Sequence, residues 1–263
     1  MAMNPLPAEY EEEYRRVFRE YAANAPSQGK YTAFWPVIGR NYPVGNGLMV
    51  VGRAVNGWTN GSDIRVLRTE HGLAAEIEEG RKESEKTSER DSPEEWLKEP
   101  RDPPRKPYNW RRSAFWRVAH DFAVDDSVVA FAPRASWPSH LAYSNLVKIA
   151  PSGGGNPNAQ RSRLLEASAP LLQLEIESLR PACVLILAGQ EWYDPFLRLV
   201  GPVTALNDNQ FVHGIAAFAS AHILLAEHPQ TRPHRRFVEA LAKAWHGEAI
   251  RQRTDIAEAA TRG

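Results

Sequence analysis

The chain has 263 residues, of which 43% are hydrophobic, so it can bury the core of one large domain. Its 32 basic and 32 acidic side chains balance at pH 7, which excludes a protein that coats nucleic acid through overall positive charge. The single cysteine, Cys183, excludes an internal disulfide and a cysteine-ligated cluster, and no apolar run approaches the roughly 18 residues of a membrane span. We therefore expect a cytoplasmic monomer without a membrane partner.

Hydrophobic spacing predicts the elements of the amino-terminal half. Aromatic residues at helical intervals predict a helix over residues 7–23. The short apolar run 48–52 ends in glycine and is typical of a buried parallel strand. A charged helix is expected over 69–90, and five prolines interrupt 93–107. We interpret residues 61–107 as an insertion or lid within a single domain that spans residues 1–263.

The carboxy-terminal half alternates between strand and helix patterns. Its expected strands are 143–149, 182–188, 211–218 and 222–226. Its expected helices are 161–179, 191–200 and 233–245, after an earlier one at 110–122. This alternation predicts the α/β class, as a three-layer α/β/α sandwich with a central, mostly parallel sheet.

Polar residues follow three of the expected strands. In a parallel sheet the carboxyl ends of the strands open on one edge, so these residues should converge there. They come from the loops after residues 52, 149 and 226, and from the middle strand itself: Asn56, Asn145, Lys148, Ser152, Asn156, His228 and Arg232.

Three of these side chains suit chemistry on a base. His228 can act as an electrophile or general acid at a developing anion, or it can merely cap the following helix. Asn145 lies within an apolar strand, and its amide matches the donor–acceptor edge of a pyrimidine, although it can equally satisfy backbone groups. Asn56 precedes Gly57, so turn formation alone also explains it.

Two segments have features that favour contact with DNA. Residues 101–117 interleave cations with aromatic rings, as phosphates and unstacked bases require, although a solvated loop with aromatic anchors has the same pattern. The glycines at 153–155 would let a DNA backbone approach main-chain N–H groups, but they also suit a plain flexible loop.

Three sequence stretches together resemble the uracil-DNA glycosylase superfamily. Residues 143–151, Tyr-Ser-Asn-Leu-Val-Lys-Ile-Ala-Pro, with Gly-Asn-Pro at 155–157, are similar to the Asn-Val-Val-Lys stretch of its iron–sulfur branch. Residues 175–181 followed by 184–189 resemble the family's helix–strand unit, and His228-Pro229-Gln230 resembles its His-Pro-Ser or His-Pro-Ala motif. The resemblance covers about residues 48–60 and 143–245, and it implies a glycosylase-like fold.

The resemblance implies a role for each matched residue. Asn145 would read the Watson–Crick edge of a flipped base, His228 would stabilise the departing anionic base, and the loop around Asn56 would hold the attacking water. The base pocket would include Gly52, Arg53, Ala54, Trp58 and Trp116. DNA contacts would come from Lys148, Ser152, Gly153, Gly154, Asn156, Arg232, Arg111 and Arg112. DNA is the expected partner, with no cofactor, metal or iron–sulfur cluster.

Departures from the family pattern favour a base other than plain uracil. Ala54 stands where relatives usually have Asp or Asn, Gln230 replaces the motif's serine, and the cluster cysteines are absent. An altered first loop and an added lid suit the branch that defends against phages by excising glucosylated hydroxymethylcytosine. Uracil excision in repair and a non-catalytic DNA-binding module are the alternatives. An esterase using Ser144 or Ser220 with His228 is a third, although Gly-x-Ser-x-Gly is missing.

Overall fold

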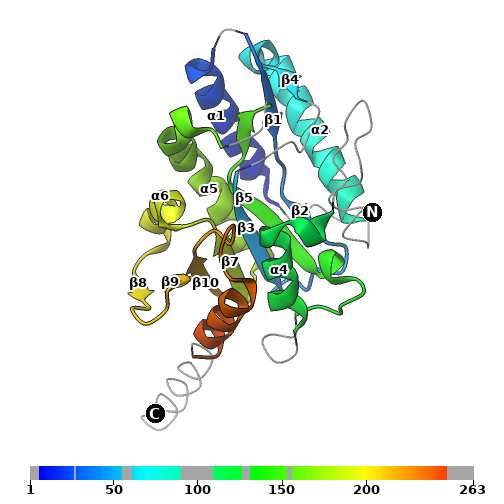
Figure 1. Ribbon diagram of the computed structural model, residues 1–263. Helices are drawn as coiled ribbons and strands as arrows, with labels where there is room; N and C mark the ends of the chain where they lie inside the picture. The colour runs from blue at the N-terminus through cyan, green and yellow to red at the C-terminus, as the bar shows by residue number, and fades with distance from the viewer. Residues whose placement is uncertain are drawn as a thin grey trace, which may run out of the picture.

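The computed structural model describes residues 6–26, 28–54, 61–89, 109–125, 131–152 and 156–247. Its main feature is a seven-stranded mixed sheet with the order β2-β5-β3-β7-β10-β9-β8 (Figure 1). The strands are β2 (Val37–Ile38), β3 (Leu48–Ala54), β5 (Leu141–Val147), β7 (Cys183–Leu187), β8 (Val203–Ala205), β9 (Val212–Phe218) and β10 (Ala221–Ala226). The α/β class predicted from the sequence is therefore confirmed.

The four central strands β5, β3, β7 and β10 run parallel, while β2, β8 and β9 are antiparallel to their neighbours. The expected strands 48–52, 182–188 and 222–226 are thus confirmed to within about two residues. Only Ala219 and Ser220 join β9 to β10, too few residues for a parallel crossover, so this pair forms a hairpin.

Helices cover both faces of the sheet and give three layers (Figure 1). One face packs against α1 (Ala8–Asn24), α5 (Arg161–Leu179) and α6 (Gln190–Val200). The other packs against α4 (Ala114–Val124) and a closing helix at 234–247. Side chains that alternate along β3 separate into the two cores, with Met49 and Val51 in one and Leu48 and Val50 in the other.

A second, three-stranded sheet has the order β4-β1-β6, from β1 (Lys30–Ala33), β4 (Ser62–Asp63) and β6 (Ile149–Pro151). The expected single strand 143–149 is therefore wrong, because the chain leaves the main sheet at Lys148 and pairs with β1. Short 3-10 turns complete the described chain: η1 (Ile64–Arg68), η2 (Trp110–Arg112), η3 (Trp137–His140) and η4 (Asn158–Gln160).

The first part of the expected insertion belongs to the packed domain. It forms β4, η1 and α2 (Glu70–Ser88), whose first turn is capped by the Thr69 hydroxyl. Leu73 and Ile77 of α2 are buried in the same core as α1. Residues 61–89 are therefore not a separate lid, and the proline-rich stretch 93–107 lies outside the described residues. No helix in the described part of the chain is long and apolar enough to cross a membrane.

Candidate functional site

Some of the predicted site residues lie at the carboxyl ends of the four parallel strands, which share one edge of the sheet. β3 ends at Ala54, β5 carries Asn145, β7 leads into Gly189, and β10 leads into Glu227 and His228. The register supports this convergence, since Gly52 lies opposite Asn145 on the neighbouring strand. The ends of β3, β5, β7 and β10 thus share one edge, whereas the segment after residue 149 belongs to the second sheet and the loop after β3 lies outside the described residues.

Gly52 and Asn145 form a closely packed corner. A Cβ atom at Gly52 would lie 2.6 Å from the Asn145 Oδ1, so only glycine fits beside this amide. The Tyr143 hydroxyl donates a hydrogen bond of 3.2 Å to the same oxygen, and Asn145 is only 1% exposed. The amide is therefore held in one orientation, as a group that discriminates between bases by hydrogen bonding must be.

Phe115, rather than Trp116, lies at the site. The Phe115 ring comes within 3.5 Å of the Cβ position of Gly52. Trp116 is buried and packs against Tyr143 and Trp137, with ring centroids 4.8 Å and 6.0 Å away. The expectation that Trp116 contacts a base is therefore wrong, because adjacent residues of α4 point in different directions and Trp116 points into the core.

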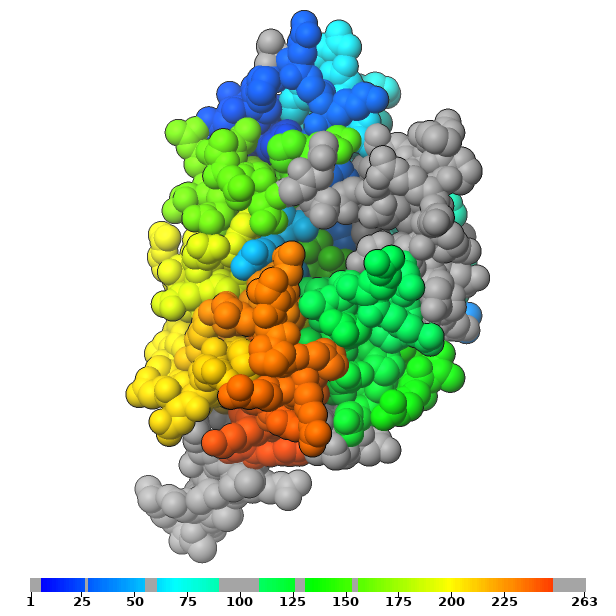
Figure 2. All heavy atoms as spheres, viewed as in Figure 1, coloured from blue at the N-terminus to red at the C-terminus, as the bar shows by residue number. Residues whose placement is uncertain are grey.

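A surface hollow of about 530 Å³ is lined by both His228 and Phe115, and Phe115 in turn lies next to Gly52. Figure 2 shows its two walls side by side, the orange segment after β10 and the green segment of η2 and α4. Its described lining residues are Asn109, Arg112, Ser113, Ala114, Phe115, His228, Gln230 and Thr231. Arg112 thus faces the hollow, whereas Arg111 is exposed with its guanidinium over the Trp110 ring.

His228 is held as a neutral hydrogen-bond donor. Its Nδ1 accepts the backbone N–H of Gln230 at 3.3 Å, which leaves the proton of a neutral ring on Nε2. Burial and the nearby Arg53 lower the pKa of His228 to about 4, although Glu227 acts in the opposite direction. At neutral pH the ring can therefore donate from Nε2 but carries no charge.

Arg53 is braced against α6. Its Nε donates to the Ala188 carbonyl at 2.6 Å, and its guanidinium lies 5.5 Å from the centre of the Trp192 ring. Arg232, four residues after His228, is exposed and pairs with Glu227 at 3.3 Å. Both arginines therefore lie at the carboxyl edge of the parallel strands, but the Arg53 side chain packs toward α6 and not in the Gly52–Asn145 corner.

Lys148 does not reach the surface. Its side chain is fully buried, and its Nζ contacts Glu175 at 2.8 Å, the Asn145 carbonyl at 2.8 Å and the Ser144 hydroxyl. Burial lowers the pKa of Lys148, and Glu175 opposes this effect. This corrects the sequence-based placement of Lys148 on DNA, because the strand break turns its side chain into the core, where it supports Asn145 from behind.

The remaining predicted site residues lie within segments outside the described residues or directly next to them. Asn56, Trp58, Gly153 and Gly154 are themselves outside the described residues. Their flanks meet, since Gly61 lies directly against Ser152 and β1 pairs with both β4 and β6. Asn156 is exposed, and Ala54 packs partly against the core opposite Val147.

The geometry does not support an esterase. Ser144 is buried and engaged by Lys148, so it cannot meet a substrate. Ser220 precedes β10 and His228 follows it, so the two side chains lie at opposite ends of that strand. No group of three His, Cys, Asp or Glu side chains in the described ranges is placed to hold a metal ion.

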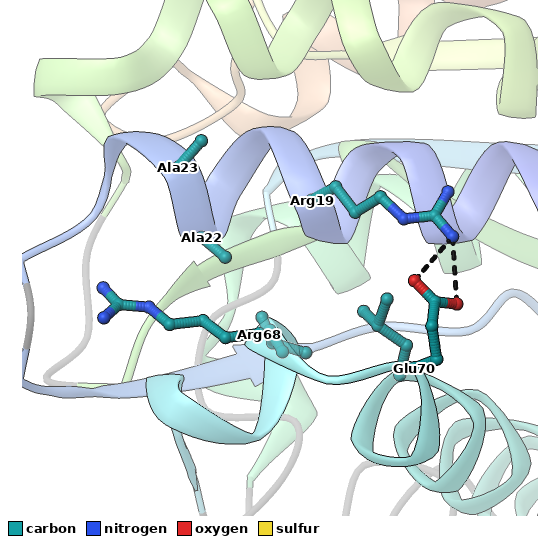
Figure 3. Close-up of a pocket in the computed structure, with 7 residues that line it drawn as sticks. Arg19, Ala22, Ala23, Arg68 and Glu70 are labelled. Atoms are coloured by element: carbon teal, nitrogen blue, oxygen red, sulfur yellow. Dashed lines mark hydrogen bonds and ion pairs between the residues drawn. The ribbon is translucent and has the colours of Figure 1, made fainter.

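A separate hollow of about 520 Å³ lies between α1 and the start of α2 (Figure 3). Arg19 spans it with two hydrogen bonds of 3.0 Å to the Glu70 carboxylate. It shares no described lining residue with the histidine hollow and contains none of the predicted site residues.

The chain matches no protein-family model, and no curated protein sequence is significantly similar to it.

Proposed function

We propose that the chain is a monofunctional DNA glycosylase, which hydrolyses the N-glycosidic bond of a flipped, modified pyrimidine and leaves an abasic site. One observation carries this proposal. The Phe115 ring joins the hollow lined by the neutral His228 to the corner formed by Gly52 and Asn145. An aromatic face, a fixed amide and an uncharged donor are the groups that a flipped base requires.

The chemistry follows from these groups. When water attacks the sugar C1′, the bond to the base nitrogen breaks, its electron pair leaves with the base, and the proton released by the water passes to solvent. The His228 Nε2–H donates a hydrogen bond to the oxygen of the departing anion, and the amide of Asn145 holds the Watson–Crick edge. A neutral imidazole can donate a hydrogen bond to this anion directly. A cationic imidazolium would instead attract a nearby carboxylate and pair with it first. The loop around Asn56 is proposed to hold the water.

The test is formation of abasic sites on a panel of DNA substrates, scored by alkali cleavage. The panel contains uracil, hydroxymethylcytosine and glucosylated hydroxymethylcytosine, each in single- and double-stranded DNA. We expect cleavage of the glucosylated DNA, its loss in His228→Ala, and its retention in His246→Ala, a matched change at an exposed histidine of the closing helix. Cleavage at uracil alone would assign the protein to repair instead.

A non-catalytic DNA-binding module is the second candidate, and Ala54 favours it. An apolar methyl group stands where relatives carry a polar side chain for the water, and it packs partly against the core. Retained DNA binding without cleavage of any substrate on the panel would support this second candidate and contradict the first.

A further inference from the structure

Glu227, the residue before His228, has both carboxylate oxygens engaged although its side chain is still 27% exposed. Its Oε1 lies 2.9 Å from His213 Nε2, and its Oε2 lies 3.3 Å from Arg232 Nη2. Its backbone N–H donates to the Phe211 carbonyl at 2.9 Å, which fixes the residue to the start of β9. The carboxylate therefore stands between the core and an exposed arginine.

The core side of this carboxylate is held by a directed chain of hydrogen bonds. Tyr193 is buried, and burial raises its pKa, so its hydroxyl stays protonated. That hydroxyl lies 2.5 Å from His213 Nδ1. When the hydroxyl donates to Nδ1, the neutral ring carries its proton on Nε2 and donates it to Glu227. Tyr193 and His213 thus hold the carboxylate in place from the core side.

Arg53 approaches the same carboxylate from β3. A Cβ atom at Gly189 would lie 3.4 Å from Arg53 Nη2, 3.8 Å from Glu227 Oε2 and 3.9 Å from the His228 backbone nitrogen. Gly189 has a φ of +86°, a conformation that favours glycine, and its lack of a side chain leaves room for this approach. The Arg53 guanidinium, the Glu227 carboxylate and the His228 backbone nitrogen therefore lie close together around Gly189, while Arg232 pairs with the Glu227 carboxylate.

We propose that Glu227 is a positioning residue, which holds Arg232 beside His228 so that its guanidinium, together with that of Arg53, binds the phosphates flanking the target nucleotide. This inference rests on the proposed function for the identity of the ligand. Guanidinium is the group best suited to phosphate oxygens, and it loses less entropy on binding when it is already fixed. Glu227 itself touches no phosphate.

The proposal predicts the sign of one substitution. A carboxylate close to DNA repels phosphate. If Glu227 acted only through this repulsion, it would weaken DNA binding, and Glu227→Gln would tighten it. If Glu227 positions Arg232, the same substitution weakens binding, because the neutral amide holds this guanidinium less firmly. The two roles therefore give opposite results in one measurement.

The experiment measures binding of the full chain to a fluorescent single-stranded oligonucleotide over a range of salt concentrations. We expect Glu227→Gln to raise the dissociation constant about threefold or more and to lower the salt slope by about one. Arg232→Ala should do the same, and the double variant Glu227→Gln/Arg232→Ala should bind no more weakly than Arg232→Ala alone, because Glu227 then has no Arg232 to hold. Glu239→Gln, which changes an exposed carboxylate of the closing helix, should leave binding unchanged.

The outcomes separate this proposal from the proposed glycosylase activity. Tighter or unchanged binding by Glu227→Gln, or fully additive effects of Glu227→Gln and Arg232→Ala, would overturn the positioning role even if bases are released. Weaker binding without any base release would support the positioning role and contradict the glycosylase. If Glu227→Gln does not fold, His213→Gln removes the backing imidazole instead and should weaken binding in the same direction. A wild-type chain that binds no DNA would overturn both.

Discussion

Replacement of Gly52 by alanine tests the packing of the proposed base-reading corner. The added Cβ would lie 2.6 Å from Asn145 Oδ1, whereas ordinary contacts of such an atom begin at 3.4 Å. Asn145 must therefore shift by most of an ångström, and its hydrogen bond from Tyr143 is lost or lengthened. Overpacking of this kind costs about 1–3 kcal/mol, and a lost hydrogen bond costs about 1 kcal/mol.

We therefore expect Gly52→Ala to lower the free energy of unfolding by about 1–3 kcal/mol in urea titrations. Base release in single-turnover assays should fall further than DNA binding does, because the amide moves while the arginines do not. Gly80→Ala is the matched control. Its Cβ would lie 3.6 Å from the Trp35 Cβ, an ordinary contact, and alanine within α2 should stabilise the helix by up to about 1 kcal/mol. A stable Gly52→Ala protein with wild-type base release would refute this account of the corner.

Three further predictions concern stability. The pKa of His228 is lowered to about 4 in the folded chain, so between pH 6.5 and 4 only the unfolded chain gains this proton, and stability falls as pH falls. Urea titrations of His228→Gln should show a smaller loss of stability over this pH range. Lys148→Met should lower stability by about 3–5 kcal/mol, and adding Glu175→Gln should recover part of it in the same assay. Thr69→Ala, which removes the cap of α2, should cost about 1 kcal/mol, as measured by thermal unfolding.

Local sequence patterns predicted the elements that lie on the sheet's main faces. The strand at 182–188 is confirmed, since its continuous apolar run is typical of a buried strand. The helix at 161–179 is confirmed, since its apolar residues repeat at helical intervals. The shared edge of the parallel strands also followed from their order alone. Asn145 was correctly placed within a strand, since a polar residue in an apolar run must be buried with a partner.

The wrong predictions concern residues whose position depends on contacts between segments that are far apart in the sequence. Lys148 looked like a surface cation because its partner Glu175 is 27 residues away on α5. Glu227 contacts His213 because β9 and β10 form a hairpin. The sequence indicates this hairpin only when the two-residue connection between the strands is recognised as too short for a parallel crossover. Phe115 and Trp116 are adjacent and both aromatic, so only the rotation of α4 shows which of them faces the hollow.

The charge state of His228 links the site's two halves. Arg53 contributes to the low pKa of the imidazole, and Glu227 opposes that effect while it lies between Arg53 and Arg232. Arg53, one of the two arginines that we propose to bind phosphate, thus also helps to keep the imidazole uncharged. A neutral imidazole whose Nδ1 already accepts a hydrogen bond can only donate from Nε2, so it cannot remove a proton from water. If this site hydrolyses a glycosidic bond, His228 therefore acts on the leaving base, and the group that orients the water must come from another residue, for which the loop after β3 is our proposal.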